Sequence, residues 1–128
     1  MKNVLTCLLA MLGLTSACDQ KNYEDADVKE FAELIADSNV IILDVRTAEE
    51  YKEGHIHGAI NIDQYPDDFV QKAKAALPIG KTIAIYCRSG RRSAHAATLL
   101  AAEGYKCVNL KGGIIAWSSD NMPVTTGM

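Results

Sequence analysis

The sequence lacks several features that would place it in other protein classes. Its formal net charge is −3 and it has no basic stripe outside one short loop, which argues against a nucleic-acid-binding surface. Its longest apolar run is well short of the roughly 20 residues that a membrane-spanning helix needs. No internal repeat or low-complexity tract is present. At 128 residues with 48% hydrophobic content, the chain is expected to form one small domain with, at most, a terminal appendage.

The first 17 residues have the pattern of a secretory signal. Lys2 lies in a short positive segment, residues 4–14 form an apolar core, and small residues follow at 15–17. Residues 1–17 are therefore predicted to be removed, and the mature protein is expected outside the cytoplasm, on the periplasmic or cell-envelope side.

Cys18 follows the signal directly. The stretch Leu14-Thr15-Ser16-Ala17-Cys18 resembles a bacterial lipoprotein lipobox, although Thr15 stands where the lipobox usually has Leu. We expect lipidation of Cys18, a polar tether over 18–25 and a folded domain over 26–126, with the lipid as the only membrane contact. The alternative is an ordinary secretory signal cut near Ala17, with Cys18 unmodified.

The rest of the chain alternates short apolar runs with segments of helical character. The runs at 40–43 and 83–86 are continuous, which is typical of strands covered on both faces. Capping-box patterns at 27–30 and 47–50 and the Ala- and Leu-rich segment 93–103 predict helices. These elements predict an α/β domain around a mostly parallel sheet. The other expected elements are a short strand ending near Ile62, a helix over 67–77, a strand over 108–110 and a short helix containing Trp117.

One strand–loop–helix segment carries the chemistry expected of this chain. The strand ends at Cys87, and a loop with three arginines leads into a helix expected to begin near Ser93. A helix N-terminus and nearby arginines favour a thiolate, and Gly90 allows a positive φ that turns N–H groups inward as an anion site. The segment therefore predicts a reactive, solvent-facing cysteine beside a second small anion. A buried structural cysteine next to a basic turn is the alternative.

The two remaining cysteines raise the question of a disulfide. Cys7 leaves with the signal, so Cys87 and Cys107 are left in an oxidising compartment. If their strands are parallel neighbours, the two are offset by about 10 Å, too far for a disulfide, which needs Cα atoms within about 7 Å. We expect two free thiols, with Cys107 buried and inert.

Five motifs occur in order and identify a family resemblance. They are Leu43-Asp44-Val45-Arg46, Glu50-Tyr51, Gly54-His55-Ile56 with Gly58-Ala59, the loop segment from Tyr86 to Ala94, and Leu110-Lys111-Gly112-Gly113 with Trp117. Together they resemble a single-domain rhodanese, a thiosulfate-type sulfurtransferase, over about 23–124. The resemblance implies a three-layer α/β/α sandwich with a parallel five-stranded sheet and no metal or organic cofactor.

The resemblance also implies roles for the loop residues. Cys87 matches the family's catalytic cysteine, which carries a sulfane sulfur as a persulfide. The substrate-binding positions match Arg88, Ser89, Gly90, Arg91, Arg92 and Ser93. The implied donor is a small sulfur-containing anion such as thiosulfate, and the implied acceptor is a thiol, cyanide or a partner protein's cysteine.

Two other functions remain open on the sequence. Cysteine-dependent phosphatases and arsenate reductases have Arg six positions after the cysteine, but here Ser93 stands there and Arg92 comes one residue too early. A non-catalytic rhodanese-like binding module is the second alternative, although such a module is expected to lack the cysteine.

Other polar and aromatic residues are expected to be structural. Asp44 and Arg46 are predicted to form a structural pair, with tuning of the loop as the alternative, and Trp117 is expected in the core. His55 and His57 are expected to be structural or exposed. His95 is the histidine best placed to face the site.

Overall fold

The computed structural model describes residues 21–127, which form five parallel strands and five helices. The strand order is β1-β5-β4-β2-β3. The strands are β1 (Glu24–Ala26), β2 (Ile41–Asp44), β3 (Ile60–Asn61), β4 (Thr82–Tyr86) and β5 (Lys106–Leu110). The helices are α3 (Val28–Ile35), α4 (Ala48–Glu53), α5 (Phe69–Ala76), α6 (Arg91–Ala102) and α7 (Gly113–Ser119).

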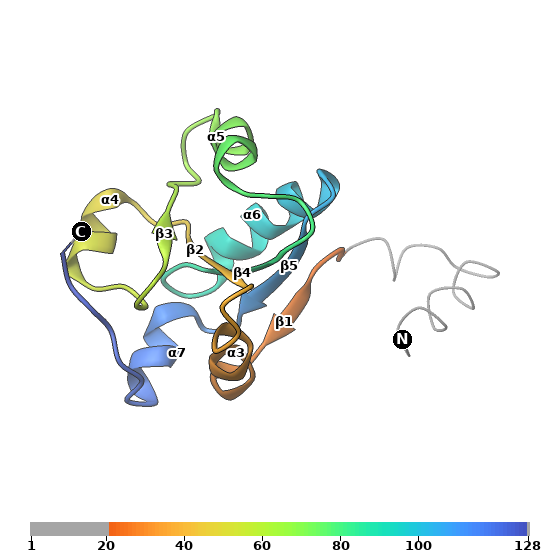
Figure 1. Cartoon of the computed structure of the whole chain (residues 1–128). Helices are drawn as coiled ribbons and strands as arrows, with labels where there is room; N and C mark the ends of the chain where they lie inside the picture. The colour runs from red at the N-terminus through yellow and green to blue at the C-terminus, as the bar shows by residue number, and fades with distance from the viewer. Residues whose placement is uncertain (1–20, 128) are drawn as a thin grey trace.

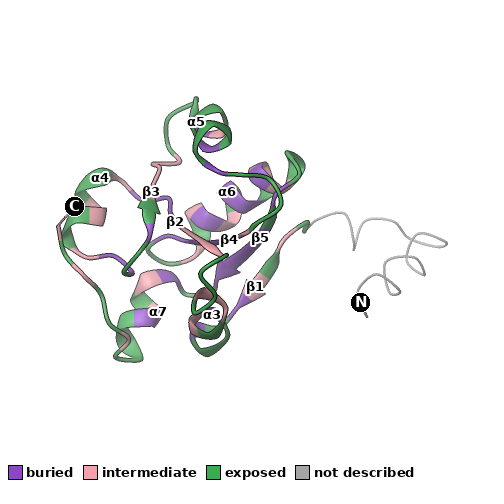
Figure 2. Cartoon of the chain, in the orientation of Figure 1, coloured by how far each residue is buried: buried purple, intermediate pink, exposed green. Residues whose placement is uncertain are grey.

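Helices cover both faces of the sheet (Figure 1). In β4, Ile83 and Ile85 pack in one core cluster with α5 and α6, while Ala84 and Tyr86 pack in a second cluster with α3 and α7. Successive residues of a strand point to opposite faces, so an apolar residue at every position is what two covered faces require. Figure 2 shows the result, with buried central strands and exposed outer helix surfaces. The predicted three-layer α/β/α sandwich is confirmed.

Both predicted capping boxes are present. Asp27 and Glu30 exchange side-chain-to-backbone hydrogen bonds of 2.8 and 2.9 Å at the start of α3. Thr47 and Glu50 do the same at the start of α4, at 3.2 and 3.0 Å. Each box satisfies N–H groups that a helix start leaves unpaired.

The N-terminal boundary of the domain differs from the prediction. Glu24 and Asp25 were expected in the tether, but they lie in β1 and pair with Val108 and Asn109 of β5. Their polarity is compatible with a strand because β1 is an edge strand with only one neighbour. The signal at 1–17 and Cys18 lie outside the described residues.

Helix α6 also begins earlier than predicted. It starts at Arg91, two residues before Ser93, because Gly90 precedes it with φ 103°, the left-handed conformation expected for this glycine. Between residues 21 and 127, no helix is long and apolar enough to cross a membrane.

Candidate functional site

Cys87 lies directly after β4, at the carboxyl edge of the sheet. Its sulfur accepts a 3.0 Å hydrogen bond from the N–H of Gly90, and Ser93 Oγ lies 3.3 Å away. The expectation of a solvent-facing Cys87 was wrong, because the residue is 1% exposed and belongs to the core cluster of α5 and α6. The alternation of β4 continues past its last residue, so Ile83, Ile85 and Cys87 all point to that face.

The β5–α7 turn positions the loop backbone. The N–H groups of Ile114 and Ile115 donate to the carbonyl oxygens of Cys87 and Arg88, at 2.9 and 3.1 Å. Gly113 makes this approach possible, since a Cβ there would lie 2.3 Å from the Arg88 carbonyl oxygen. The start of α7 thus holds two carbonyl groups of the loop. The N–H of Gly90, in the same loop, donates to the Cys87 sulfur.

The three arginines of the loop region do not have equal roles. Arg88 and Arg91 are exposed, and neither forms a salt bridge within the described part of the chain. Arg92 instead pairs with both carboxylate oxygens of Glu50, at 2.8 and 3.0 Å, and its guanidinium lies over the Tyr65 ring. Substrate binding by Arg92 stays a prediction; in the structure its charge is balanced by Glu50, and the pair ties α6 to α4.

The Arg92 pair perturbs the titration of Glu50. The hydrogen bond from Arg92 is the largest cause, and with the capping bonds from Thr47 it outweighs burial and lowers the pKa of Glu50 to about 2. Glu50 therefore serves both the capping box of α4 and the arginine of α6. The Glu50-Tyr51 motif singled out Glu50 in the sequence, but nothing in the sequence indicated Arg92 as the partner of Glu50.

Sequence reasoning missed a polar chain behind the sulfur. Ser93 is fully buried, and its Oγ lies 2.6 Å from Asn109 Oδ1. Asn109 Nδ2 in turn donates to Asp25 Oδ1 at 3.1 Å. The available signal was Asn109 itself, a polar residue inside an otherwise apolar strand run, since a buried amide requires partners.

Asp44 and Arg46 form the expected structural pair. Both are buried, at 0% and 5% exposure, and Arg46 Nη2 lies 2.6 Å from Asp44 Oδ2. The same nitrogen donates to the carbonyl oxygen of Gly54 at 2.7 Å. The pair thus ties the end of β2 to the end of α4 and has no contact with the Cys87 sulfur.

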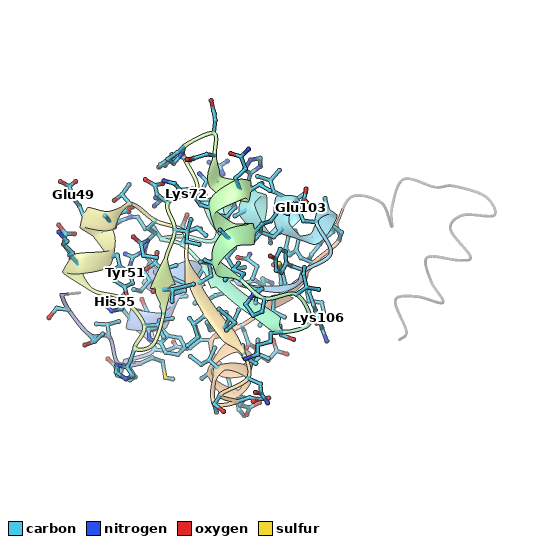
Figure 3. All side chains as sticks on the ribbon, turned by 45° about the horizontal axis from the view of Figure 1, so that its top comes forward. Glu49, Tyr51, His55, Lys72, Glu103 and Lys106 are labelled. Atoms are coloured by element: carbon cyan, nitrogen blue, oxygen red, sulfur yellow. The ribbon has the colours of Figure 1, made fainter. Side chains whose placement is uncertain are left out.

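The histidines and Trp117 are placed largely as expected. His55 is buried, stacks on the Tyr51 ring, and its Nδ1 lies 2.7 Å from the Tyr51 carbonyl oxygen (Figure 3). His57 and His95 are exposed. Trp117 is 3% exposed in the core and donates to the Pro123 carbonyl oxygen. None of these side chains hydrogen-bonds the sulfur in the described part of the chain.

The expectation of two free cysteines is confirmed. Cys107 pairs in register with Ile83, four residues before Cys87, and neither cysteine is bonded to the other. Burial raises the pKa of Cys107 to about 11, so its thiol is protonated and unreactive at neutral pH. Within 21–127, no group of three or more His, Cys, Asp or Glu side chains is arranged to hold a metal ion.

Comparison with known proteins places these features in a family. The family model described as a rhodanese-like domain matches residues 27–120. A sulfurtransferase of Allochromatium vinosum is 34% identical over 78% of this chain and 92% of its own length. A tRNA uridine(34) hydroxylase of Acinetobacter baumannii is 38% identical over 76% of this chain, but over only 32% of its own length. The crystal structure of a rhodanese-related protein from Thermoplasma volcanium covers 80% of this chain and 98% of that one, with 32% identity and a TM-score of 0.72.

Proposed function

Because the chain belongs to the rhodanese-like family, we propose that it is a sulfurtransferase that carries a sulfane sulfur as a persulfide on Cys87. The observation that carries the proposal is the position of the Cys87 sulfur. It lies at the carboxyl edge of the sheet, beside the N-terminus of the 12-residue helix α6, and accepts a hydrogen bond from Gly90 N–H. Such surroundings stabilise negative charge on sulfur.

The reaction has two steps. The Cys87 thiolate attacks the outer sulfur of a donor such as thiosulfate, the donor's S–S bond breaks, and sulfite leaves with the bonding electrons. The outer sulfur stays on Cys87 as a persulfide. A thiolate or cyanide then attacks that outer sulfur, and Cys87 leaves as the thiolate.

The loop assists through charge and backbone groups. Arg88 and Arg91 are exposed and attract the anionic donor. Ser89 and Gly90 form the backbone of the loop, and the Gly90 N–H donates to the Cys87 sulfur. Arg92 lies further from solvent and is paired with Glu50, and Ser93 contacts the Cys87 sulfur directly. Small sulfur-containing anions are therefore the donors that suit this site.

The geometry argues against phosphatase or arsenate reductase chemistry. Those enzymes hold a tetrahedral oxyanion with an arginine six positions after the cysteine, where this chain has Ser93. Arg92 is one residue earlier and is already paired with Glu50. A shorter loop encloses less space, which suits a single outer sulfur.

Mass spectrometry tests the proposal directly. The purified protein is incubated with thiosulfate, and the Cys87 peptide is examined for one added sulfur atom, which cyanide should remove as thiocyanate. Cys87→Ser provides the blank. If wild-type Cys87 gains no sulfur from thiosulfate or polysulfide, the non-catalytic binding module becomes the better assignment.

We further propose that the protein is exported and anchored through lipid on Cys18. The signal pattern that ends directly before Cys18 supports this proposal, and β1 begins six positions later, at Glu24. Because β1 runs parallel to β5, it enters at the amino edge of the sheet (Figure 1), whereas Cys87 follows the carboxyl end of β4. The anchored protein thus presents Cys87 away from the membrane. Cys18→Ser should move the protein from the membrane to the soluble fraction, and a soluble wild type would refute the anchor.

A further inference from the structure

Three polar side chains lead from the sheet edge to the Cys87 sulfur. Asp25 lies in β1, Asn109 is its register partner in β5, and Ser93 lies in the first turn of α6. Successive contacts measure 3.1 Å from Asp25 Oδ1 to Asn109 Nδ2, 2.6 Å from Asn109 Oδ1 to Ser93 Oγ, and 3.3 Å from Ser93 Oγ to Cys87 Sγ. Asp25, Asn109 and Ser93 are called the polar chain below.

Hydrogen bonds in the polar chain run in one direction only. Burial raises the pKa of Asp25, but hydrogen bonds from Lys21 and Asn109 together lower it below its usual value, so Asp25 is ionised at neutral pH. A carboxylate only accepts, which turns the Asn109 NH₂ group toward Asp25 and the amide oxygen toward Ser93. The amide oxygen also only accepts, so the single proton of the Ser93 hydroxyl points at Asn109.

This direction determines what Ser93 offers to the sulfur. With its one proton donated to Asn109, Ser93 Oγ presents only lone pairs to Cys87 Sγ. A Cys87 thiol can donate its proton to them, but a thiolate receives nothing. To donate to a thiolate, the Ser93 hydroxyl must turn and leave Asn109 Oδ1 without that partner. Ser93 and Asn109 are 0% and 4% exposed, so losing that bond carries a desolvation penalty.

We propose that Asp25 and Asn109 are positioning residues that hold Ser93 as an acceptor for the Cys87 thiol, so that thiolate formation requires the Ser93 hydroxyl to turn. When the thiol ionises, its S–H electrons stay on sulfur, its proton passes to solvent water, and Ser93 turns its own proton from Asn109 to Sγ. The inference rests on the proposed function, in which Cys87 is the nucleophile, and assigns the residues that control the hydrogen bond between Ser93 and its sulfur.

Other charged groups near the site are accounted for separately. Arg88 and Arg91 favour the thiolate from the solvent side, and Arg92 is balanced by Glu50. Further charged or titratable groups of the surrounding elements include the Asp44–Arg46 pair at the end of β2, Lys21 paired with Asp25, and Lys111 after β5. Glu24 of β1, Lys106 of β5 and His95 of α6 are exposed. In the described residues, none of these hydrogen-bonds Ser93. The polar chain therefore acts on the sulfur independently of the arginines.

The experiment measures the pH profile of Cys87 alkylation by iodoacetamide, followed on the Cys87 peptide by mass spectrometry. Asn109→Leu removes the acceptor of the Ser93 proton, so Ser93 can donate to the sulfur and the midpoint should fall by about 0.5 to 1 pH unit. One unit below the wild-type midpoint, alkylation should be about three- to fivefold faster. In a Ser93→Ala background, Asn109→Leu should produce no shift.

Asp25→Ala provides a second variant at the sheet edge, which keeps Asn109 in the core. It removes the shorter contact of the Asn109 NH₂ group and leaves only the 3.5 Å contact with the Gly90 carbonyl oxygen. The amide can then turn its NH₂ group toward Ser93 more easily, so the midpoint should again fall, by less than in Asn109→Leu. Glu24→Ala is the matched control, because it removes the same charge from β1 without touching Asn109, and it should leave the profile unchanged.

The outcomes are separable from those of the proposed function. If Asn109→Leu does not fold, as judged by circular dichroism, Asp25→Ala against Glu24→Ala decides the question. An unchanged or raised midpoint in the folded variants, or a shift that persists without Ser93, would overturn the inference. Because alkylation needs no sulfur donor, the shift can be observed even if the protein transfers no sulfur, which would refute the proposed function alone.

Discussion

The backbone N–H of Ile114 donates a 2.9 Å hydrogen bond to the carbonyl oxygen of Cys87. This contact joins the N-terminus of α7 to the loop that follows β4, and Ile115 repeats it on Arg88. The two segments approach so closely that Gly113, with φ 61°, has no room for a Cβ. The loop that presents the sulfur therefore depends on a turn 26 residues further along the chain.

Gly113→Ala should separate backbone strain from displacement of the loop. An alanine held in the left-handed conformation costs roughly 1–2 kcal/mol at either Gly113 or Gly104. Gly104→Ala is the control, since its φ is 99° and its Cβ would meet nothing within 4 Å. Urea unfolding should show a loss of stability for both variants, and a larger loss for Gly113→Ala, whose Cβ must also displace the Arg88 backbone. Only Gly113→Ala should lose about tenfold or more in kcat/KM for sulfur transfer, because its Cβ pushes the Arg88 carbonyl. Equal activities would contradict this role of α7.

Cys87→Ala and Cys107→Ala form a matched pair. Both cysteines are free, buried and part of the same core cluster, so each change should lower the free energy of unfolding by about 1 kcal/mol. Only Cys87→Ala should abolish transfer of sulfur from thiosulfate to cyanide. Loss of activity in Cys107→Ala, with its unfolding midpoint preserved, would be incompatible with an inert Cys107.

Arg91→Gln should weaken binding of an anionic donor selectively. Arg91 is exposed, so its charge attracts thiosulfate through solvent, and KM should rise about two- to fivefold. An uncharged disulfane donor should be little affected. Raising the salt concentration should shrink the difference between wild type and variant. Lys106→Gln removes the same charge at the far, amino end of β5 and should leave both KM values unchanged (Figure 3).

The Glu50–Arg92 pair should make stability depend on acid pH. The pKa of Glu50 is lowered from 4.5 to about 2, so its contribution is fully present above about pH 4.5 and is lost as pH falls through about 2. Because the pair is partly exposed and screened by solvent, that contribution is about 1 kcal/mol. Thermal unfolding of wild type and Glu50→Gln should differ at pH 6 and converge near pH 2. If the difference in stability between wild type and Glu50→Gln stays constant from pH 6 to pH 2, the ion pair is not the source of that difference.

Short-range patterns determined much of this protein from the sequence alone. The capping boxes at Asp27 and Thr47 work within four residues, and continuous apolar runs such as β4 indicate a sheet covered on both faces. The count from Cys87 to Ser93 argued against a loop of the phosphatase or arsenate reductase type. These predictions needed no tertiary contact, because hydrogen-bonding and burial requirements of neighbouring residues are readable locally.

Contacts between distant residues were decided only by the tertiary structure. Arg92 finds Glu50 at a separation of 42 residues, and Asn109 finds Asp25 at a separation of 84. Both pairings follow from the arrangement of the elements, and the second follows from a sheet order that places the first strand beside the last. The burial of Cys87 likewise depends on which face of β4 the helices α5 and α6 cover. A sequence pattern gives the polarity of a side chain, but its partner is set by the packing of whole elements, since many pairings satisfy the same polarity.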